Sequence, residues 1–530
     1  MNPALSRFCI ISLLFATAGS LAGQVSYEDL LDPPAADWLT YGRTYDSQRH
    51  SPLDEIQKEN VGRLGAAWIF AVPGAGRLEA VPLVRDGVMY VSQPNQVFAL
   101  DARTGREIWS WQRQPATERG PNRGVALLGD LVYVGLPDAY LVALDARTGN
   151  QVWEAKVAEA EEGYYCPAAP FAIDGKVLMG VAAGDYGLNG WLDAYDATTG
   201  ELLWRWHTIP KPGEPGSETW EGDSWKTGGG GTWLTGSFDP ELNLLYWGIG
   251  NPAPDFDGDV REGDNLYTES LVALDASTGE LKWYFQFTPH DVHDWDSVEI
   301  PILVDAPYKG EERKLVVHAD RNGFYYVLDR VTGEFLDGTP FIDKLNWATG
   351  LTDEGRPIRV PGVEPTIHGN FVCPSTSGAT NWMSPAYNPA TGWFYLAAKE
   401  GCGISYKGKQ EFRPGGFGYM ATGYVESPSE PWQMYVRALD LTTGERLWEY
   451  KQVNSRHYGA GLVSTAGGLI FAGDDQGFLT AHDAENGEAL WHFNTGARIS
   501  ASPISYAVNG RQFVAVAAGK NVVAFALPEE

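Results

Sequence analysis

The chain is poor in the features that mark several common classes of protein. It has four cysteines in 530 residues and no CxxCH motif, which excludes a covalently attached haem c on this chain. Lysine and arginine number 39 against 68 aspartates and glutamates, and a net charge of −29 disfavours nucleic acid and anionic membrane surfaces. Beyond the N-terminus no apolar run is long enough to span a bilayer. We therefore expect neither a nucleic acid partner nor a membrane span.

The first 22 residues have the pattern of an export signal. Arg7 precedes the apolar run FCIISLLFA, and the small residues TAGSLAG follow it, which predicts cleavage after Ala22. The mature chain, residues 23–530, would then be a soluble protein of the periplasm or another exported location. In such an oxidising compartment Cys373 and Cys402 could form a disulfide across a modest loop, although their spacing alone does not fix the pairing.

One sequence unit recurs along the mature chain. VFALDARTGREIW ends at Trp109, and comparable units end at Trp153, Trp204, Trp283, Trp448 and Trp491, with a degenerate copy at Phe335. Each unit reads as a strand, a tight turn formed by Asp and Gly, and a second strand. The tryptophan lies eight residues after the aspartate, and its recurrence predicts that it docks between one repeat and the next.

The repeats predict an all-β fold, an eight-bladed β-propeller of four-stranded antiparallel blades that fills residues 23–530 as a single domain. Trp68, near the mature N-terminus, supplies the eighth aromatic position but has no ALD turn before it. We expect its strand to pair with the C-terminal segment NVVAFALP, so that the two termini share one blade. The 111-residue gap between Asp329 and Asp440 predicts extra hairpins, such as AYNPATGWFYLAA.

Polar segments between the repeats carry the candidate chemistry. The stretch FTPHDVHDWDS, residues 287–297, places three aspartates directly after an apolar strand, where like charges repel unless a cation is present. At one face of a propeller, Asp185, Asn251, Asp294 and Asp296 could converge into a set of hard oxygen ligands. Such a set suits a calcium-like ion or one of higher charge, and not zinc. Taken singly, each of these residues is more often a turn or capping residue.

The motifs together resemble those of a known family. ALD-x-x-TG-x-x-x-W repeats, GGGGTW, GIGNPAP, TPHDVHDWD and DRNGFYYVLDR are similar to those of the pyrroloquinoline quinone (PQQ)-dependent alcohol dehydrogenases, over essentially the whole mature chain. This resemblance implies an enzyme that oxidises an alcohol to an aldehyde by hydride transfer to PQQ bound to a metal ion. It implies periplasmic export and a lanthanide ion, with Ca²⁺ as the alternative.

The resemblance also implies roles for the acidic residues. Asp294 matches the catalytic base that takes the hydroxyl proton of the alcohol and is also a metal ligand. Asn251 matches a metal ligand, and Asp185 stands where the family usually has a glutamate, one methylene longer. Asp296 matches the extra carboxylate of the lanthanide-using branch. His290 and His293 are expected to make structural hydrogen bonds, because a hard ion does not select imidazole.

Five further residues match the family's cofactor contacts. Trp233 matches the flat floor under the quinone, whereas the alternative for it is core packing. Arg123 matches a partner of the quinone carboxylates, and Glu79, Arg321 and Asn381 match other polar contacts. For Arg321 the alternative is a surface ion pair. The resemblance also implies a disulfide between Cys373 and Cys402.

The chain departs from the family at the rim of the expected pocket. Thr117 and Glu118 stand where the family often has two adjacent cysteines, and Gly459, next to Tyr458, stands where a tryptophan is expected. Substrate choice is therefore open. A sugar or polyol dehydrogenase using the same cofactor is one alternative, and a non-catalytic propeller scaffold is another. A separate cytochrome c-type acceptor is expected because this chain binds no haem c, and the oligomeric state stays open, with a homodimer as one alternative.

Overall fold

The computed structural model describes residues 24–114, 120–182, 184–455 and 457–529. The expected export signal and the residues Thr117 and Glu118 lie outside these ranges. Within them the regular secondary structure is almost entirely β-strand, which confirms the all-β prediction. Helical structure in these ranges is limited to α1 (Tyr27–Leu31), η1 (Val61–Arg63), η2 (Ala160–Glu162), η3 (Gly184–Tyr186), η4 (Ser217–Thr219), η5 (Ser224–Thr227) and η6 (Gly258–Val260).

Most strands of the described residues form eight antiparallel sheets with four strands each, to one of which a short strand adds in parallel. The first four sheets in chain order are β3 (Leu83–Arg85), β4 (Val88–Gln93), β5 (Gln96–Asp101) and β6 (Glu107–Gln112); β7 (Val125–Leu128), β8 (Leu131–Gly135), β9 (Tyr140–Asp145) and β10 (Gln151–Lys156); β11 (Phe171–Ile173), β12 (Lys176–Gly180), β13 (Trp191–Asp196) and β14 (Leu202–His207); β15 (Ser237–Asp239), β16 (Leu244–Gly248), β17 (Ser270–Asp275) and β18 (Leu281–Gln286).

The other four sheets follow in the same pattern. They are β19 (Ile302–Tyr308), β20 (Glu311–Ala319), β21 (Phe324–Asp329) and β22 (Phe335–Pro340); β26 (Ala386–Asn388), β27 (Trp393–Glu400), β30 (Gln433–Asp440) and β31 (Arg446–Lys451); β32 (Leu462–Thr465), β33 (Leu469–Gly473), β34 (Phe478–Asp483) and β35 (Ala489–Asn494), extended by β1 (His50–Ser51); and β36 (Ile504–Val508), β37 (Arg511–Ala518) and β38 (Asn521–Ala526), completed by β2 (Gly65–Ala71).

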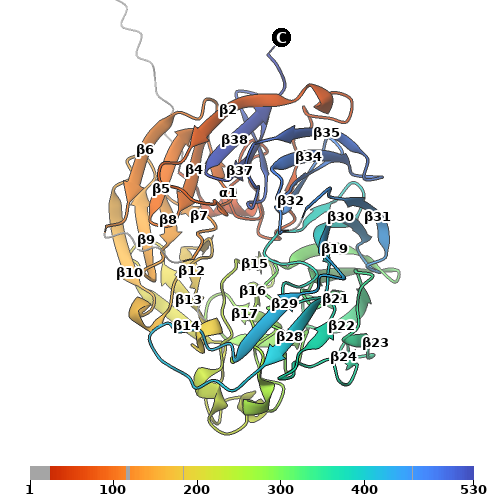
Figure 1. Cartoon of the computed structure of the whole chain (residues 1–530). Helices are drawn as coiled ribbons and strands as arrows, with labels where there is room; N and C mark the ends of the chain where they lie inside the picture. The colour runs from red at the N-terminus through yellow and green to blue at the C-terminus, as the bar shows by residue number, and fades with distance from the viewer. Residues whose placement is uncertain (1–23, 115–119, 183, 456, 530) are drawn as a thin grey trace, which may run out of the picture.

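The sheets succeed one another around a common centre, with β7 near the middle of the molecule and β10 at its rim (Figure 1). The ring is closed by the pairing of β2, near the start of the chain, with β38, at its end. This pairing confirms the prediction that the strand of Trp68 joins the C-terminal segment. It places strands from near both ends of the chain side by side in one sheet, hydrogen-bonded to each other.

The recurrent tryptophans hold neighbouring sheets together. The indole Nε1 of Trp109 donates a 2.9 Å hydrogen bond to the carbonyl oxygen of Ala146 in the next repeat. Its ring covers Gly149, where an added Cβ would lie 2.5 Å from Trp109 Cε3, so glycine is required at that turn. The same donor bond to the following repeat is made by Trp68, Trp153, Trp204, Trp283 and Trp448. The predicted docking role is therefore confirmed.

The last tryptophan seals the ring. Trp491 Nε1 donates to the carbonyl oxygen of Leu64, directly before β2, at 3.0 Å. Phe335 has no indole nitrogen, and at its seam Gly444 packs instead against the ring of Tyr325. Six repeats and the closing contact thus share one polar anchor, whereas at the seam of the degenerate repeat the Tyr325 hydroxyl donates a 2.8 Å hydrogen bond to the carbonyl oxygen of Leu441.

A bulge in the outer strand aims each tryptophan at its seam. In the β5–β6 pair, Leu100 faces Glu107 and Ala99 faces Trp109, so Ile108 is an extra residue. Ile108 is 52% exposed, whereas Trp109 is 9% exposed. An added residue in one strand reverses the side that the next residue faces. The bulge is repeated in the other sheets that carry the turn motif and was not foreseen from the sequence.

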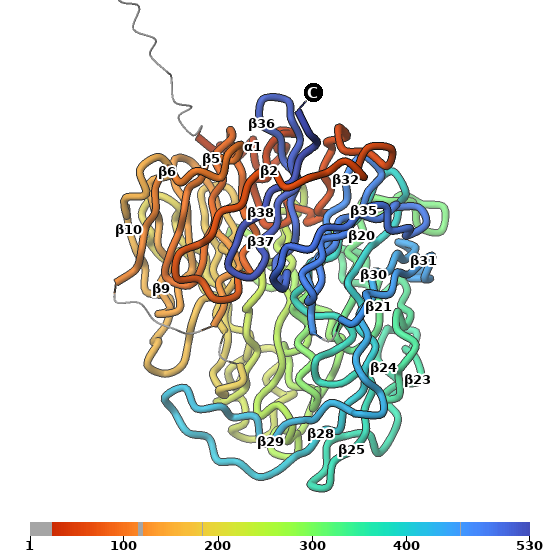
Figure 2. Tube along the Cα trace, turned by 45° about the horizontal axis from the view of Figure 1, so that its top comes forward, coloured from red at the N-terminus to blue at the C-terminus, as the bar shows by residue number. Residues whose placement is uncertain are grey.

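The long gap between repeats holds the extra hairpins that were predicted. The hairpin of β23 (Ala348–Leu351) and β24 (Pro357–Arg359) is one of them. The segment AYNPATGWFYLAA also folds as a hairpin, β26–β27, but this hairpin is part of a regular four-stranded sheet and is not an extra one. A separate small sheet contains β25 (Asn370–Val372), β28 (Gly403–Lys407) and β29 (Thr422–Glu426). In Figure 2 this sheet lies on the opposite side of the molecule from α1 and β36.

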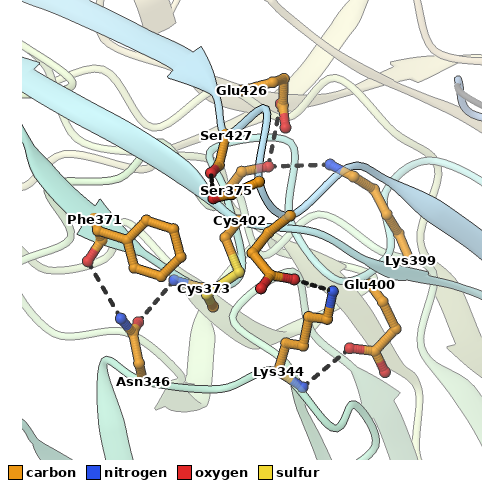
Figure 3. Close-up of a disulfide and its surroundings, with 12 residues drawn as sticks. Lys344, Asn346, Phe371, Cys373, Ser375, Lys399, Glu400, Cys402, Glu426 and Ser427 are labelled. Atoms are coloured by element: carbon orange, nitrogen blue, oxygen red, sulfur yellow. Dashed lines mark hydrogen bonds and ion pairs between the residues drawn. A yellow bond between two sulfur atoms is a disulfide. The ribbon is translucent and has the colours of Figure 1, made fainter.

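A disulfide between Cys373 and Cys402 anchors this insertion, as the family resemblance implied. It joins the residue after β25 to the residue before β28 (Figure 3). Beside it, Ser375 Oγ accepts a 3.1 Å hydrogen bond from Lys399 Nζ and donates one to Glu426 on β29. No helix in the described part of the chain is both long enough and apolar enough to cross a bilayer.

Candidate active site

A cavity of about 210 Å³ brings together side chains that are far apart in the sequence. Seven of the nine predicted site residues line it, and they come from six loops, since Asp294 and Asp296 share the loop after β18: Arg123, Asp185, Trp233, Asn251, Asp294, Asp296 and Asn381. The two others, Glu79 and Arg321, form ion pairs with lining residues. A larger cavity of about 800 Å³, lined by Trp432 and Lys451 among others, contains none of the nine.

The loop after β18 is held in shape by Asp291. Its carboxylate accepts hydrogen bonds from the backbone N–H groups of His293, Asp294 and Trp295, at 2.8 to 3.2 Å. Asp294 adopts a left-handed backbone conformation (φ 60°), which aspartate tolerates better than most residues. Asp291 thus has a structural role, and it fixes the position from which Asp294 enters the cavity.

The two histidines of this loop also serve the fold. His290 Nδ1 lies 2.8 Å from the carbonyl oxygen of Gly263. His293 does not make the expected hydrogen bond, because neither of its buried ring nitrogens has a partner. Its ring lies 4.5 Å from that of Trp295, and burial lowers its pKa to about 3. A histidine that stays neutral in an aromatic contact adds no positive charge to offset the aspartates beside it.

Asp296 is the most fully bonded carboxylate of the site. Its Oδ1 accepts from Trp233 Nε1 and from the backbone N–H of Asn251, both at 3.1 Å. Its Oδ2 accepts a 2.5 Å bond from Arg321, whose other amino group donates to the carbonyl oxygens of Asp294 and Thr376. Arg321 is buried, so it is not the surface ion pair that was the alternative.

Three other carboxylates approach one another closely. One oxygen of each of Asp185, Asp255 and Asp294 lies within 4.8 Å of the other two. Removal from water raises the pKa of Asp185 to about 6, and the negative charge of Asp296 adds to the shift. Burial also raises the pKa of Asp294 well above its ordinary value; Arg321 opposes this shift, and Asp255 adds to it. A cation among these oxygens would offset both the free-energy cost of burying charged carboxylates and their mutual repulsion.

The opposite wall of the cavity is aromatic and cationic. The Arg123 guanidinium lies 4.8 Å from the ring centre of Trp233 and 5.9 Å from that of Trp382. Glu79 is buried between two arginines, with Arg77 at 2.6 Å and Arg123 at 3.1 Å. Trp233 is therefore a wall of the cavity, and its alternative as a plain core residue does not fit.

Tyr458 fills the position beside the missing tryptophan. Its ring centre lies 4.8 Å from that of Trp382, and its hydroxyl accepts a 3.2 Å hydrogen bond from Asn381 Nδ2. At Gly459 an added Cβ would lie 2.5 Å from the carbonyl oxygen of Gly473. A tryptophan at position 459 would thus require a backbone shift, and Tyr458 supplies the aromatic surface instead.

The residues present fit both groups that the resemblance implied. Carboxylate and amide oxygens form the donor set of a hard cation, and there are too few fixed positive charges to neutralise them. Buried Nε atoms of Arg123 and Arg321 have no hydrogen-bond partner. Unpaired buried donors next to a flat aromatic wall suit a planar anionic cofactor.

Sequence reasoning missed three contributors to the site. Tyr165 and Trp382 line the cavity, and Asp255 belongs to the carboxylate cluster. Trp382 directly follows Asn381, and Asp255 follows the GNPAP turn, so both lie within motifs already singled out. Tyr165 carried no comparable signal, because nothing in its local sequence predicts which loops meet at the centre of the ring.

Comparisons with known proteins show which family the chain resembles over most of its length. A family model described as glucose/ethanol/alcohol dehydrogenase, beta-propeller domain, matches residues 38–339, and one described as outer membrane protein assembly factor BamB matches residues 433–527. The quinoprotein alcohol dehydrogenase PedH of Pseudomonas putida is 40% identical over 98% of this chain and 92% of its own length. The quinohemoprotein alcohol dehydrogenase of Comamonas testosteroni is 39% identical over 91% of this chain and 72% of its own.

Solved structures extend the likeness to three dimensions. The quinohemoprotein alcohol dehydrogenase of Comamonas testosteroni superposes with a TM-score of 0.88 at 36% identity, covering 93% of this chain and 82% of that one. A europium-containing methanol dehydrogenase superposes with a TM-score of 0.88 at 29% identity, covering 94% of this chain and 100% of that one. The expected propeller fold is thereby confirmed.

Proposed function

The chain belongs to the PQQ-dependent alcohol dehydrogenase family, and we propose that it is an exported quinoprotein that oxidises an alcohol to an aldehyde. One observation carries this proposal. Asp185, Asn251, Asp294 and Asp296 meet in a cavity whose other wall is formed by Trp233 and Arg123. The same cavity thus offers oxygen ligands for a cation, a flat surface for a quinone and a carboxylate that can serve as a base.

The side chains of the site would have different roles in the reaction, according to their chemistry. Bound PQQ would supply the hydride acceptor, and the ion beside it a Lewis acid. The Asp294 carboxylate would take the hydroxyl proton of the alcohol, which makes the carbinol C–H a better hydride donor. Asp291 holds the loop that presents Asp294, through the three backbone hydrogen bonds described above.

The remaining site residues would hold the cofactor and the ion. Trp233 would stack on the quinone, and Arg123 would meet a quinone carboxylate. Arg321 and Asn381 would face its polar edge, and Glu79 would keep Arg123 in place through their 3.1 Å ion pair. Asp185, Asn251, Asp294 and Asp296 would be the ion's ligands.

We propose a lanthanide as the ion, with Ca²⁺ as the alternative. The high density of carboxylates supports the trivalent ion, because the attraction between an ion and its ligands grows with the charge of both. One similar solved structure is a europium-containing methanol dehydrogenase. Asp296, which the resemblance assigned to the lanthanide-using branch, lies in the wall of the cavity.

We further propose export by the signal in residues 1–22, followed by one propeller in residues 23–530. The eight four-stranded sheets support eight blades. Because the chain has no CxxCH motif, electrons would pass to a separate acceptor such as a cytochrome c. A formal charge of −29 favours a basic acceptor through charge steering, and a rate of reoxidation that did not depend on ionic strength would argue against it.

A second candidate is a sugar or polyol dehydrogenase with the same cofactor. The description of the matching family model includes glucose as well as ethanol and alcohol, which keeps this alternative open. A non-catalytic scaffold has less support. The family model that is named for an assembly factor matches only residues 433–527, whereas the dehydrogenase PedH aligns over 98% of the chain.

Reconstitution of the purified protein tests the proposal. The chain would be prepared without cofactors, then loaded with PQQ and either a light lanthanide or Ca²⁺, and its metal content and absorption spectrum recorded. Short alcohols and aldoses would then be offered with an artificial electron acceptor. We expect uptake of one ion and one quinone per chain and faster oxidation of alcohols. A chain that binds neither ion nor quinone is not a quinoprotein.

A further inference from the structure

We propose that Asp255 is a further ligand of the cation, through its Oδ2 atom. This inference rests on the proposed function, since it adds a residue to the ion site described there. The site inferred from the family motifs contains Asp185, Asn251, Asp294 and Asp296. Asp255, which lies in the sequence NPAPDF, belongs to none of the assigned positions.

The side chain of Asp255 is completely buried, and only one of its two carboxylate oxygens has a hydrogen-bond partner. Its Oδ1 accepts a 3.0 Å hydrogen bond from Asn251 Nδ2, whereas its Oδ2 has no hydrogen-bond partner. An unpaired oxygen of a buried carboxylate is costly and is rare in folded proteins. The bond to Asn251 also fixes the amide, so that its Oδ1 faces Gly184, next to Asp185.

The spacing of the oxygens fits a coordination sphere. Oxygens of Asp185, Asp255 and Asp294 all lie within 4.8 Å of one another. An ion that binds oxygen at about 2.3 to 2.6 Å holds its most distant ligands about 4.6 to 5.2 Å apart. The separations among the three oxygens are therefore those of ligands that share one ion.

The nearby arginines do not neutralise Asp255. Arg321 donates its hydrogen bonds to Asp296 and to two backbone carbonyl oxygens. Arg261 is fully buried beside the loop, but it donates to the side chain of Asn265 and to the carbonyl oxygens of Pro254, Asp255 and Asp291. The charge of Arg261 attracts the Asp255 carboxylate, but neither guanidinium is hydrogen-bonded to it, so a bound ion would be its direct counter-charge.

The extra carboxylate also explains how a short ligand is tolerated. Asp185 is one methylene shorter than the glutamate that the family usually has at that position, and Asp255 supplies an additional oxygen to the same cluster. With Asp296 included, four carboxylates and the guanidinium of Arg321 give the site a formal charge of −3. This charge matches a trivalent ion better than a divalent one.

Terbium luminescence measures the binding of a trivalent ion to the site directly, and it requires neither turnover nor bound quinone. The quinone-free full chain would be titrated with TbCl₃ under tryptophan excitation, since Trp233 Nε1 lies 3.1 Å from Asp296 Oδ1. Luminescence lifetimes in H₂O and D₂O would count the water molecules on the ion. The variants are Asp255→Asn, which removes the charge with little change in shape, and Asp255→Ala, which removes the ligand atom.

We expect both variants to bind Tb³⁺ at least about 10- to 100-fold more weakly, since even residues outside the ligand shell reach this magnitude. In the Asp255→Ala variant one more water should occupy the ion. Asp257→Ala is the matched control, because Asp257 is also buried, lies two residues further on and is not part of the cluster. Thermal unfolding would confirm that each variant is folded.

Three results would overturn the inference. The first is unchanged Tb³⁺ affinity in both variants, and the second is an unchanged water count in Asp255→Ala, which would make Asp255 only a distant charge. The third is an equal loss of affinity in Asp257→Ala. If the unsubstituted chain itself binds no Tb³⁺, the proposed function fails as well, so the two failures are distinguishable.

Discussion

The aspartates of the blade turns and the aspartates of the cavity place one residue type in two opposite environments. In the turn after β9, Asp145 Oδ1 accepts from the backbone N–H groups of Arg147 and Thr148 and from the Thr148 hydroxyl. Partial burial acts to raise its pKa, but these bonds and the charge of Arg147 hold the pKa below its ordinary value. In the cavity, burial and mutual repulsion raise the pKa of Asp185 and Asp294.

The difference separates folding from function. A turn aspartate finds every partner within three residues, so it stabilises the fold with nothing from outside the chain. Asp185 comes from the loop between β12 and β13, whereas Asp255 and Asp294 come from loops next to β16 and β18 of another sheet. As a group the cavity aspartates lack enough positive partners. They are destabilising until a cation binds, which is the expected cost of a preformed ion site.

The largest effect should follow from Asp294→Asn. Asparagine has nearly the same shape but cannot accept the hydroxyl proton, so turnover should fall by about 10²- to 10⁴-fold, the usual contribution of a general base. Uptake of PQQ, followed by absorbance, should remain largely intact. The matched control is Asp145→Asn in a turn, which should retain turnover. An Asp294→Asn enzyme of normal activity would falsify the base assignment.

The next effect concerns how pH changes the stabilisation by an ion. A carboxyl whose pKa is raised by folding stabilises the folded state fully below about pH 4, and this stabilisation is lost as the pH rises through the folded-state pKa. The folded-state pKa is about 6 for Asp185 and well above the ordinary value for Asp294. Bound La³⁺ replaces those protons, so its stabilising effect should grow from pH 4 to pH 7. At an ion concentration 100 times Kd the gain is about 3 kcal/mol.

Thermal unfolding with La³⁺ and with a chelator, over the same range of pH, measures this gain. The control is a set of unfolding curves with K⁺ at equal ionic strength, which reports screening alone. Equal stabilisation by La³⁺ at pH 4 and pH 7 would contradict the view that the cavity carboxyls must lose protons before an ion binds.

The same contrast explains which parts of the molecule were predictable from the sequence. The Asp–Gly turn and the tryptophan are local signals that recur, so they predicted the sheets, the docking of Trp109 on the next repeat, and the shared sheet at the termini. The bulge at Ile108 was not predictable, because no residue type marks it and only the pairing register reveals the extra residue.

The residues of the site could not be predicted from local sequence signals in this way. Its members were identified because their motifs resemble a family, and not because spacing showed that Asp185 and Asp294 would meet. Asp255 escaped notice although it directly follows the GIGNPAP motif, because its partners lie 4, 39 and 70 residues away, at Asn251, Asp294 and Asp185. Convergence of this kind depends on how the whole ring closes, which the local sequence does not encode.

The smallest effect is expected at the turns. Asp145→Ala leaves the backbone N–H groups of Arg147 and Thr148 without their acceptor, as the loss of a helix cap does, and should lower the free energy of unfolding by about 1 kcal/mol. Urea unfolding measures this loss, and Tb³⁺ affinity should stay unchanged because Asp145 is remote from the carboxylate cluster. The control is Asp353→Ala, at an exposed aspartate between β23 and β24, which should change stability by less than about 0.5 kcal/mol. If Asp145→Ala weakened the binding of Tb³⁺ without lowering stability, the turn and cavity aspartates would not be separate classes, and the division between folding and function would be wrong.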